Sequence, residues 1–438
     1  MRSTLFHIPH ADAVWGIPLF GFGWLLAIVV LAGLLTTGYR LVRHGWNRDA
    51  LNDLGLFVVL SIIVVVAQRI EELDVDGTPL GVPIRAYGLL VLLGIAAGIT
   101  LSVRQAQSMG IRPDTIFALC FWIVVGGFLG ARTFYVLQKW DEFARPTVLE
   151  TLGQIINLTD GGLVVYGSFI GATIAFAVFM WKHQLPTLAL ADLLAPGLMI
   201  GLTLGRLGCL MNGCCWGGVC ERSSLGIRFP QGSPPFVDQL ERGLLVGMRL
   251  QEEKDANSRI TWIVEEVTPG GLADTLGLKV GERLRNLRLP DDLQFHRMRS
   301  GRSVPDATVS WQRADGRMVE WTFGQLPERS RPVYPVQLIA SVNAALLCLF
   351  LWAYYPFRRR DGEVLALLIT IYPVMRILEE MIRTDESSVF VTQFRWTISQ
   401  WISSILVVVA VGLWAYLWTR PRGSRLPPDA AARQVGKA

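Results

Sequence analysis

Apolar runs constrain the fold of this 438-residue chain more strongly than any motif in it. A helix that crosses the hydrocarbon core of a bilayer needs ~20 predominantly apolar residues. Because lipid offers no hydrogen bonds to an open backbone, only helices and closed barrels cross it. The sequence therefore predicts an all-α polytopic membrane protein with about nine transmembrane helices. They are expected at residues 14–37, 52–68, 84–104, 114–137, 161–181, 190–212, 334–356, 363–383 and 396–419, of which the second is the shortest.

Basic residues in the short loops predict the orientation of these helices, because Lys and Arg are enriched on the cytoplasmic side. They follow every second span, as at Arg40, Arg43, Arg48, Arg358, Arg359, Arg360, Arg420 and Arg422. The N-terminus and the loop after residue 212 are thus expected outside, and the C-terminus in the cytoplasm. The net charge of +5 is assigned to these loops, and nothing indicates a nucleic-acid partner. Residues 1–13 lack the pattern of a removable signal peptide.

The membrane pattern stops between residues 213 and 331, where charged and turn-forming residues take over. Short strands are expected at residues 262–264, 307–311 and 318–322. Residues 267–273 and 276–284 resemble the helix and following turn of a PDZ domain of the bacterial protease type, and the resemblance covers 246–325. It implies a small β-rich exterior insert that binds a peptide ligand by strand addition. The alternative is an insertion that only orders the exterior face, since no carboxylate-binding loop is recognisable.

Arg206 lies at the end of an apolar run, within the segment GRLGCLMNGCCWG at residues 205–217. A charge deep in a bilayer is costly, ~2.5 kcal/mol or more at full depth, so such residues usually face a partner or a ligand. The guanidinium fork can give two parallel donors to phosphate oxygens. A phosphate at this depth belongs to a phospholipid, so the segment predicts a protein that handles lipid. The alternative is an arginine that extends to the head groups without binding a substrate.

The same segment is similar to the signature of the prolipoprotein diacylglyceryl transferases. Arg206, Gly208, Asn212 and Gly217 match it, whereas Cys209 and Cys214 stand where the family usually has Asn and Glu. Further family blocks follow the family order, at residues 83–88, 130–132, 160–171, 334–338 and 376–385. Residues 1–72 and the insert lie outside the matched blocks. The predicted organisation is extra N-terminal helices in 1–72, a transferase core in 73–245 and 326–420, the PDZ-like insert in 246–325, and a disordered tail in 421–438.

This resemblance implies a transferase of the bacterial inner membrane that needs no cofactor and no metal. Its implied substrates are phosphatidylglycerol and prolipoprotein signal peptides with a lipobox cysteine, and glycerol phosphate is released. Arg206, Arg376 and Tyr166 are the expected catalytic residues, because the departing phosphate needs fixed cations. The spacing of Arg376, Glu380 and Arg383 places them on one helical face, where Glu380 holds Arg376 or pairs with Arg383. The expected lipid-binding residues are Arg85, Tyr87, Arg132, Gly162, Gly167, Asn212, Gly217, Glu380 and Arg383.

Tyr166 is the most consequential departure from the family, which has a histidine in this block. None of the five histidines of the chain falls in a matched motif. One interpretation is that Tyr166 supplies a hydrogen bond while the arginines generate the substrate thiolate. The other is that the activity is altered or lost, which leaves a catalytically silent membrane scaffold that binds peptides through the insert.

The exterior cysteines Cys209, Cys214, Cys215 and Cys220 invite a metal or redox interpretation. Their spacing departs from the paired Cys-x-x-Cys pattern of zinc sites, so this signal is weak. A disulfide of Cys220 with Cys214 or with Cys215 is compatible with the exterior side, and helix-packing thiols are the alternative.

Overall fold

The computed structural model describes residues 4–8, 13–14, 17–18, 22–45, 54, 57–58, 60–61, 64, 72–73, 79–157, 162–220, 226–254, 260–291, 294–295, 298, 304–383 and 396–424. Contacts divide the chain into two compact units. We call Leu90–Arg228 with Arg331–Ala438 the helical unit, and Met1–Leu89 with Phe229–Ser330 the sheet unit. Most of the predicted span 52–68, the end of the block at 376–385 and most of the predicted tail lie outside the described residues.

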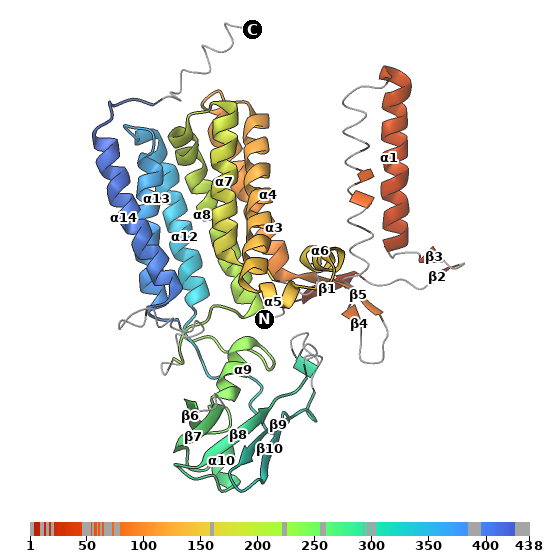
Figure 1. The fold of residues 1–438 in the computed structure, drawn as a ribbon, viewed down its shortest axis with the longest axis vertical. Coiled ribbons are helices and arrows are strands. Elements are labelled where there is room, and N and C mark those ends of the chain that lie inside the picture. The colour runs from red at the N-terminus through yellow and green to blue at the C-terminus, as the bar shows by residue number, and fades with distance from the viewer. Residues whose placement is uncertain are drawn as a thin grey trace. The chain divides into compact units, whose positions relative to one another are not determined.

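Helices form more than half of the described chain, and most of them are long (Figure 1). Among the described residues, seven helices are long and apolar enough to cross a membrane. The protein is therefore a mostly helical, polytopic membrane protein, and the predicted count of nine spans is not confirmed. The seven candidate spans are Leu26–Arg43, Ala86–Gln107, Pro113–Gln138, Val165–His183, Thr187–Asn212, Val336–Phe357 and Ile398–Trp418.

Two predicted spans differ from the helices that form. The helix expected from residue 14 begins only at Phe22, as α1 (Phe22–His44), because β2 (Ala13–Val14) and β3 (Ile17–Pro18) pair with each other instead. The span expected at 363–383 is α13 (Glu363–Glu380), which is absent from the seven candidates. Charged residues at both of its ends interrupt the apolar run.

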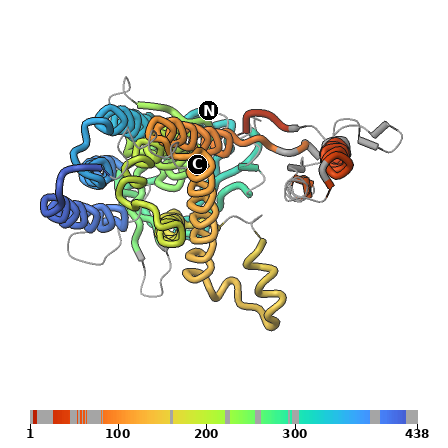
Figure 2. The backbone as a smooth tube through the Cα atoms, turned by 90° about the horizontal axis from the view of Figure 1, so that it is seen from above, coloured from red at the N-terminus to blue at the C-terminus, as the bar shows by residue number. Residues whose placement is uncertain are grey.

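The helical unit contains α3 (Ala86–Gln107), α4 (Pro113–Gln138), α7 (Val165–His183), α8 (Thr187–Asn212), α12 (Val336–Tyr354), α13 and α14 (Ile398–Trp418). The short helices α5 (Trp140–Phe143) and α6 (Val148–Ile156) follow α4. α4 and α7 lie side by side (Figures 1 and 2). A Cβ atom on Gly167 would overlap the carbonyl oxygen of Gly130, so only glycine permits this approach of the two backbones. The predicted lipid-binding residue Gly167 thus has a packing role in the structure.

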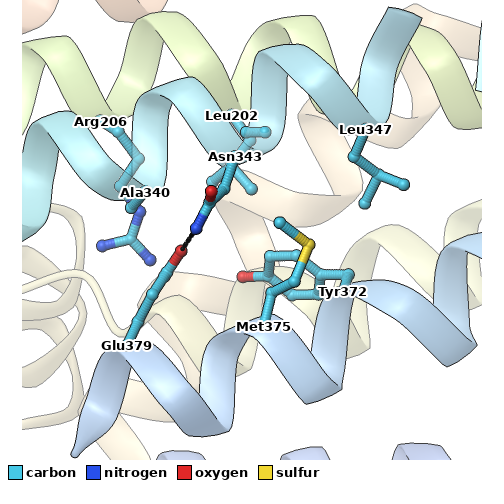
Figure 3. Close-up of a pocket in the computed structure, with 9 residues that line it drawn as sticks. Leu202, Arg206, Ala340, Asn343, Leu347, Tyr372, Met375 and Glu379 are labelled. Carbon is cyan, nitrogen blue, oxygen red and sulfur yellow. Dashed lines mark hydrogen bonds between the residues drawn. The ribbon is translucent and has the colours of Figure 1, made fainter. Parts of the chain in front are cut away.

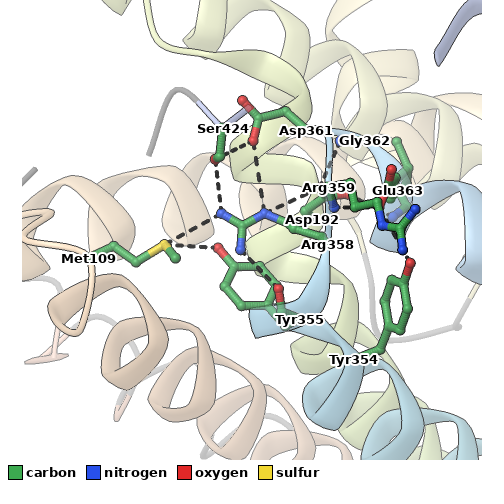
Figure 4. Close-up of polar contacts among 11 residues, drawn as sticks. Met109, Asp192, Tyr354, Tyr355, Arg358, Arg359, Asp361, Gly362, Glu363 and Ser424 are labelled. Carbon is green, nitrogen blue, oxygen red and sulfur yellow. Dashed lines mark hydrogen bonds and ion pairs between the residues drawn. The ribbon is translucent and has the colours of Figure 1, made fainter. Parts of the chain in front are cut away.

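A buried polar cluster fastens α8 to α13 (Figure 4). Asp192 of α8 is fully buried, and its carboxylate accepts hydrogen bonds from the backbone N–H groups of Gly362 at 2.7 Å and Leu365 at 2.8 Å. Arg358, just after the 3₁₀ turn Tyr355–Phe357, lies 3.9 Å from the same carboxylate and donates to Ser424 Oγ at 3.1 Å. Buried polar groups persist when they are hydrogen-bonded. This cluster fixes the relative position of the two helices that carry Arg206 and Arg376.

The sheet unit holds two larger sheets. β1 (Thr4–Ile8), β5 (Pro79–Arg85) and β4 (Glu72–Leu73) form one sheet in the order β1-β5-β4. The other is a five-stranded antiparallel sheet in the order β10-β9-β8-β7-β6. Its strands are β6 (Met248–Lys254), β7 (Ile260–Val267), β8 (Arg283–Arg288), β9 (Thr308–Arg313) and β10 (Met318–Thr322). The three strands expected from the sequence are confirmed.

The insert has its own apolar core around Trp311 and Trp321. Helix α9 (Pro234–Glu241) contributes Phe236 and Leu240 to this core, so the folded module includes residues before the predicted start at 246. Helix α10 (Leu272–Thr275) occupies the place of the predicted PDZ helix. The resemblance of the insert to a PDZ domain stays a prediction.

Candidate functional site

A small cleft that is open to solvent lies between α8, α12 and α13 (Figure 3). The side chains that face it recur at helical spacing, so each helix presents one face to the cleft. The polar residues of the lining are Arg206, Asn343, Tyr372 and Glu379, and the apolar ones are Leu202, Ala340, Ala344, Leu347 and Met375. A cleft with apolar walls and a few convergent polar groups suits a ligand that has a long apolar part and a polar head.

Arg206 is the cation of this cleft, and it is half-buried. Among the described residues, none accepts a hydrogen bond from its guanidinium or lies within ion-pair distance of it. Glu379 attracts the guanidinium from a greater distance, while one of its oxygens accepts a hydrogen bond from Asn343 Nδ2 at 3.0 Å. The N–H groups of Arg206 are therefore available to an anionic ligand that enters the cleft.

Arg376, Glu380 and Arg383 form a buried ion triad at the end of α13. The Nη1 atoms of Arg376 and Arg383 lie 2.7 and 3.2 Å from the same oxygen, Oε2 of Glu380. The side chains are 9%, 1% and 5% exposed for Arg376, Glu380 and Arg383. Glu380 therefore pairs with both Arg376 and Arg383, which the sequence offered as alternative partners. Two guanidinium groups share one carboxylate, so the triad keeps a net positive charge.

The segment after α8 connects this triad to the start of α12. The N–H of Gly217 donates to the carbonyl of Tyr334 at 3.1 Å, and that of Gly218 donates to Ile382 at 3.1 Å. A Cβ atom on Gly217 would lie 2.8 Å from the Tyr334 and Val336 side chains. Gln337, from the matched block at 334–338, donates to the carbonyl of Cys214 at 2.7 Å. Gly217 and Gln337 therefore hold together the segment after α8, the segment after α13 and the start of α12.

The positive charges of Arg383 and Arg206 act on the thiol of Cys215. Its pKa is lowered, first by hydrogen bonds from the Cys209 and Cys214 thiols and then by the charges of Arg383 and Arg206, against the opposing effect of burial.

Arg132 and Gly162 lie together elsewhere in the helical unit. Arg132 is buried, and its guanidinium donates to the carbonyls of Ile155, Gln154 and Asn157 at the end of α6 and to that of Gly162 at 3.1 Å. This arrangement closes the connection between α6 and α7. The expected contacts of both residues with lipid stay predictions.

The other expected site residues do not line the Arg206 cleft. Tyr166 is half-buried in the first turn of α7, and Asn212 is exposed at the last residue of α8. Arg85 ends β5, and Tyr87 lies exposed in the first turn of α3. Their predicted roles are not tested by the geometry.

Sequence reasoning missed Asn343, Tyr372 and Glu379. Two signals were present, namely a polar amide in the apolar run of α12 and a second carboxylate beside Glu380. Tyr372, Met375 and Glu379 share one helical face, which is a different face from that of Glu380.

The helices define a multi-pass membrane protein, and the cleft between three of them presents an arginine beside largely apolar walls. A family model described as "Prolipoprotein diacylglyceryl transferase" matches residues 78–416. A relative from Rhodopirellula baltica, named "Phosphatidylglycerol--prolipoprotein diacylglyceryl transferase", is 37% identical over 97% of this chain and 90% of its own length. The chain therefore belongs to the prolipoprotein diacylglyceryl transferase family. This match also extends into the N-terminal segment and the insert, which the sequence motifs did not reach.

More distant relatives match a shorter part of the chain. A protein of the same name from Deinococcus radiodurans is 34% identical over 36% of this chain and 46% of its own length. One from Clostridium perfringens, named "Phosphatidylglycerol--prolipoprotein diacylglyceryl transferase 2", is 34% identical over 36% of this chain and 59% of its own length.

Proposed function

We propose that this protein transfers a diacylglyceryl group from phosphatidylglycerol to the lipobox cysteine thiol of prolipoproteins, forming a thioether and releasing glycerol phosphate. The observation that carries the proposal is the uncommitted guanidinium of half-buried Arg206, in a cleft whose walls are largely apolar. Family membership and the near full-length relative support the same activity. A silent scaffold of this fold has no need for a cation held open to an anionic ligand.

In the proposed reaction the substrate thiol attacks the carbon of the diacylated glycerol that carries the phosphate ester. The C–S bond forms as the C–O bond breaks, and the electron pair of that bond leaves on the phosphate oxygen. The thiol proton is lost to solvent or to the departing glycerol phosphate. Arg206 donates two N–H groups to the phosphate oxygens as negative charge grows there. Arg376, oriented by Glu380, adds a second cation, and the same field favours the thiolate of the incoming cysteine.

Turnover by the purified protein tests this function directly. The full chain is supplied with phosphatidylglycerol and a lipobox peptide, and the thioether product is sought by mass spectrometry. A peptide with serine in place of the lipobox cysteine and a lipid without the phosphoglycerol head serve as controls. A folded protein that yields no thioether would support the scaffold instead.

We also propose that the protein lies in the bacterial inner membrane with its N-terminus outside and its C-terminus in the cytoplasm. Arg360 Nε donates to the carbonyl of Arg420 at 2.9 Å, so the arginine-rich segments that follow α12 and α14 lie next to each other. This supports the orientation, because arginine-rich loops are enriched on the cytoplasmic side. The insert, which follows α8, is then exterior. Alkaline phosphatase fused within the insert is expected to be active, and the same reporter fused after residue 420 inactive. The reverse activities would contradict this topology.

Tyr166 is proposed to support the reaction through a hydrogen bond, since phenols keep their proton at neutral pH. Tyr166→Phe is expected to slow transfer partially. Tyr166→His, which restores the usual family residue, is expected to retain the activity or raise it. The pH–rate profiles of both variants and the parent on one lipobox peptide provide the measurement. If Tyr166→Phe is as inactive as an Arg206 variant, Tyr166 carries the proton transfer itself, and if it matches the parent, the hydroxyl has no role.

The insert is proposed to handle substrate peptides through a PDZ-like surface, and not to take part in the chemistry. Pro230 and Arg329 pair as an antiparallel bridge, and Ser330 Oγ accepts a hydrogen bond from the N–H of Phe229 at 2.9 Å. The chain therefore enters and leaves the insert at one place, where truncation is tolerated best. Replacing residues 231–328 by a short Gly/Ser linker is expected to preserve transfer to a minimal lipobox peptide. A stable truncated protein that is inert toward that peptide would show that the insert builds part of the active site.

A further inference from the structure

Three cysteine thiols converge where α8 ends, although their spacing in the sequence gives no paired zinc pattern. The Sγ atoms of Cys209, Cys214 and Cys215 all lie within 4.8 Å of one another. All three thiols are free and partly exposed. Gly213 ends α8 with a φ of 77°, and the N–H of Cys214 donates to the carbonyl of Cys209 at 3.1 Å. This reversal of the chain, which the linear spacing does not reveal, brings the three side chains together.

The backbone that presents these thiols is held in a fixed conformation. Cys215 has a φ of 60°, a value that residues other than glycine rarely adopt. Such a conformation persists where the surroundings hold it, and it is often found at functional sites. Here Gln337 holds the carbonyl of Cys214, and Gly217 is bonded to Tyr334 two residues beyond Cys215. The three thiols are therefore preorganised before any ligand arrives.

The number of thiols in the cluster and the charge around them distinguish a metal site from a disulfide. A disulfide uses two thiols and leaves the third unpaired, whereas a single ion can use all three. A complex of three thiolates with Zn²⁺ carries one net negative charge, and the complex with Cu⁺ carries two. Arg383 forms an antiparallel bridge with Gly217, two residues beyond Cys215, and its positive charge is opposite to that of such an anionic complex.

We propose that Cys209, Cys214 and Cys215 form a three-thiolate site for a thiophilic d¹⁰ cation, Zn²⁺ or Cu⁺. A Zn–S bond of ~2.3 Å places neighbouring sulfurs roughly 4 Å apart, which small side-chain rotations reach from the observed cluster. Soft thiolate ligands select these ions over Mg²⁺ or Ca²⁺. The bound ion ties the segment after α8 to the end of that helix. The site supplies no nucleophile to the proposed transfer reaction, because that thiol comes from the substrate.

Metal content of the full-length protein tests the proposal. The protein is purified in detergent without a histidine tag under reducing conditions, and is incubated in separate arms with Zn²⁺ and with Cu⁺. After excess ion is removed, one equivalent per chain is expected to remain in at least one arm. Co²⁺ used as a probe is expected to give thiolate-to-metal charge-transfer absorption. The triple variant Cys209→Ser/Cys214→Ser/Cys215→Ser should lose both signals, and the matched Cys220→Ser variant should keep them.

Three results would overturn the site: no retained ion in either arm, equal retention by the triple variant, or a disulfide within the cluster in protein purified without reductant. The last is detected by peptide mass spectrometry and would replace the metal by a redox pair. Should the triple variant fail to fold, the single variant Cys214→Ser serves instead. It is expected to lose its ion to a chelator that the parent withstands, and retention equal to the parent would likewise exclude the site.

Discussion

Replacing Arg206 by alanine is expected to lower the rate of diacylglyceryl transfer a hundredfold or more while the protein still folds. Removal of one donor to a developing oxyanion costs ~10²–10³ in kcat, and the Arg206 fork offers two donors to the departing phosphate. No described residue accepts a hydrogen bond from this guanidinium, so its removal leaves no such acceptor unpaired. Initial rates with phosphatidylglycerol and a lipobox peptide, followed by mass spectrometry, provide kcat and KM.

One further variant separates the effect of the planar guanidinium from that of its charge, and a second serves as a control. Arg206→Lys is also expected to be impaired, because an ammonium group lacks the planar pair of donors. Arg112→Ala is the matched control, since that arginine is 82% exposed at its side chain beside Asp114. A near-parent rate for Arg206→Ala would refute the assignment of the site. Full activity of the lysine variant would leave Arg206 only a general electrostatic role.

The sequence predicted the helices well because their apolar runs match the thickness of a bilayer. It also predicted α13, which begins at the expected residue but is not among the seven candidate spans, since Arg376, Glu379 and Glu380 bring charge into the end of that helix. Those charges are tolerated because they are paired within the fold, which composition alone does not reveal. The start of α1 was misplaced by eight residues for a local reason, because a short strand pair that includes Pro18 precedes the helix.

Motif matching found arginines of the candidate site, and the lipid-binding roles expected for the glycines stay predictions. Gly167 and Gly217 match a lipid-handling signature, yet both stand where a side chain would collide with a neighbouring segment. Conversely, Asn343 and Tyr372 belong to no matched block and line the Arg206 cleft. Which residues meet across α8, α12 and α13 depends on helix packing, and this information is distributed over segments more than a hundred residues apart. Periodicity within one helix identifies a face but not its partner.

Glu380→Gln is expected to have the largest effect on stability. Glu380 is 1% exposed and counters two guanidinium groups that are themselves almost fully buried. Breaking a buried ion pair by removing one partner costs ~3–5 kcal/mol, because the remaining charge is left buried without compensation. Here two charges remain, on Arg376 and Arg383, and glutamine supplies an amide of similar shape without the negative charge. The midpoint of thermal unfolding, followed by tryptophan fluorescence in detergent, should fall clearly below that of the parent.

The matched control is Glu142→Gln, which removes a carboxylate from an exposed pair with Lys139 at 2.7 Å. Exposed pairs contribute ~0–1 kcal/mol, so this variant should unfold close to the parent. If Glu380→Gln also unfolds at a temperature close to that of the parent, the carboxylate of Glu380 does not hold the triad together. At a temperature where the parent and both variants are folded, Glu380→Gln is expected to transfer more slowly, because Arg376, the second cation of the proposed reaction, loses the carboxylate that pairs with it. Unchanged kinetics together with lowered stability would confine Glu380 to the fold and leave Arg206 as the cation on which catalysis depends.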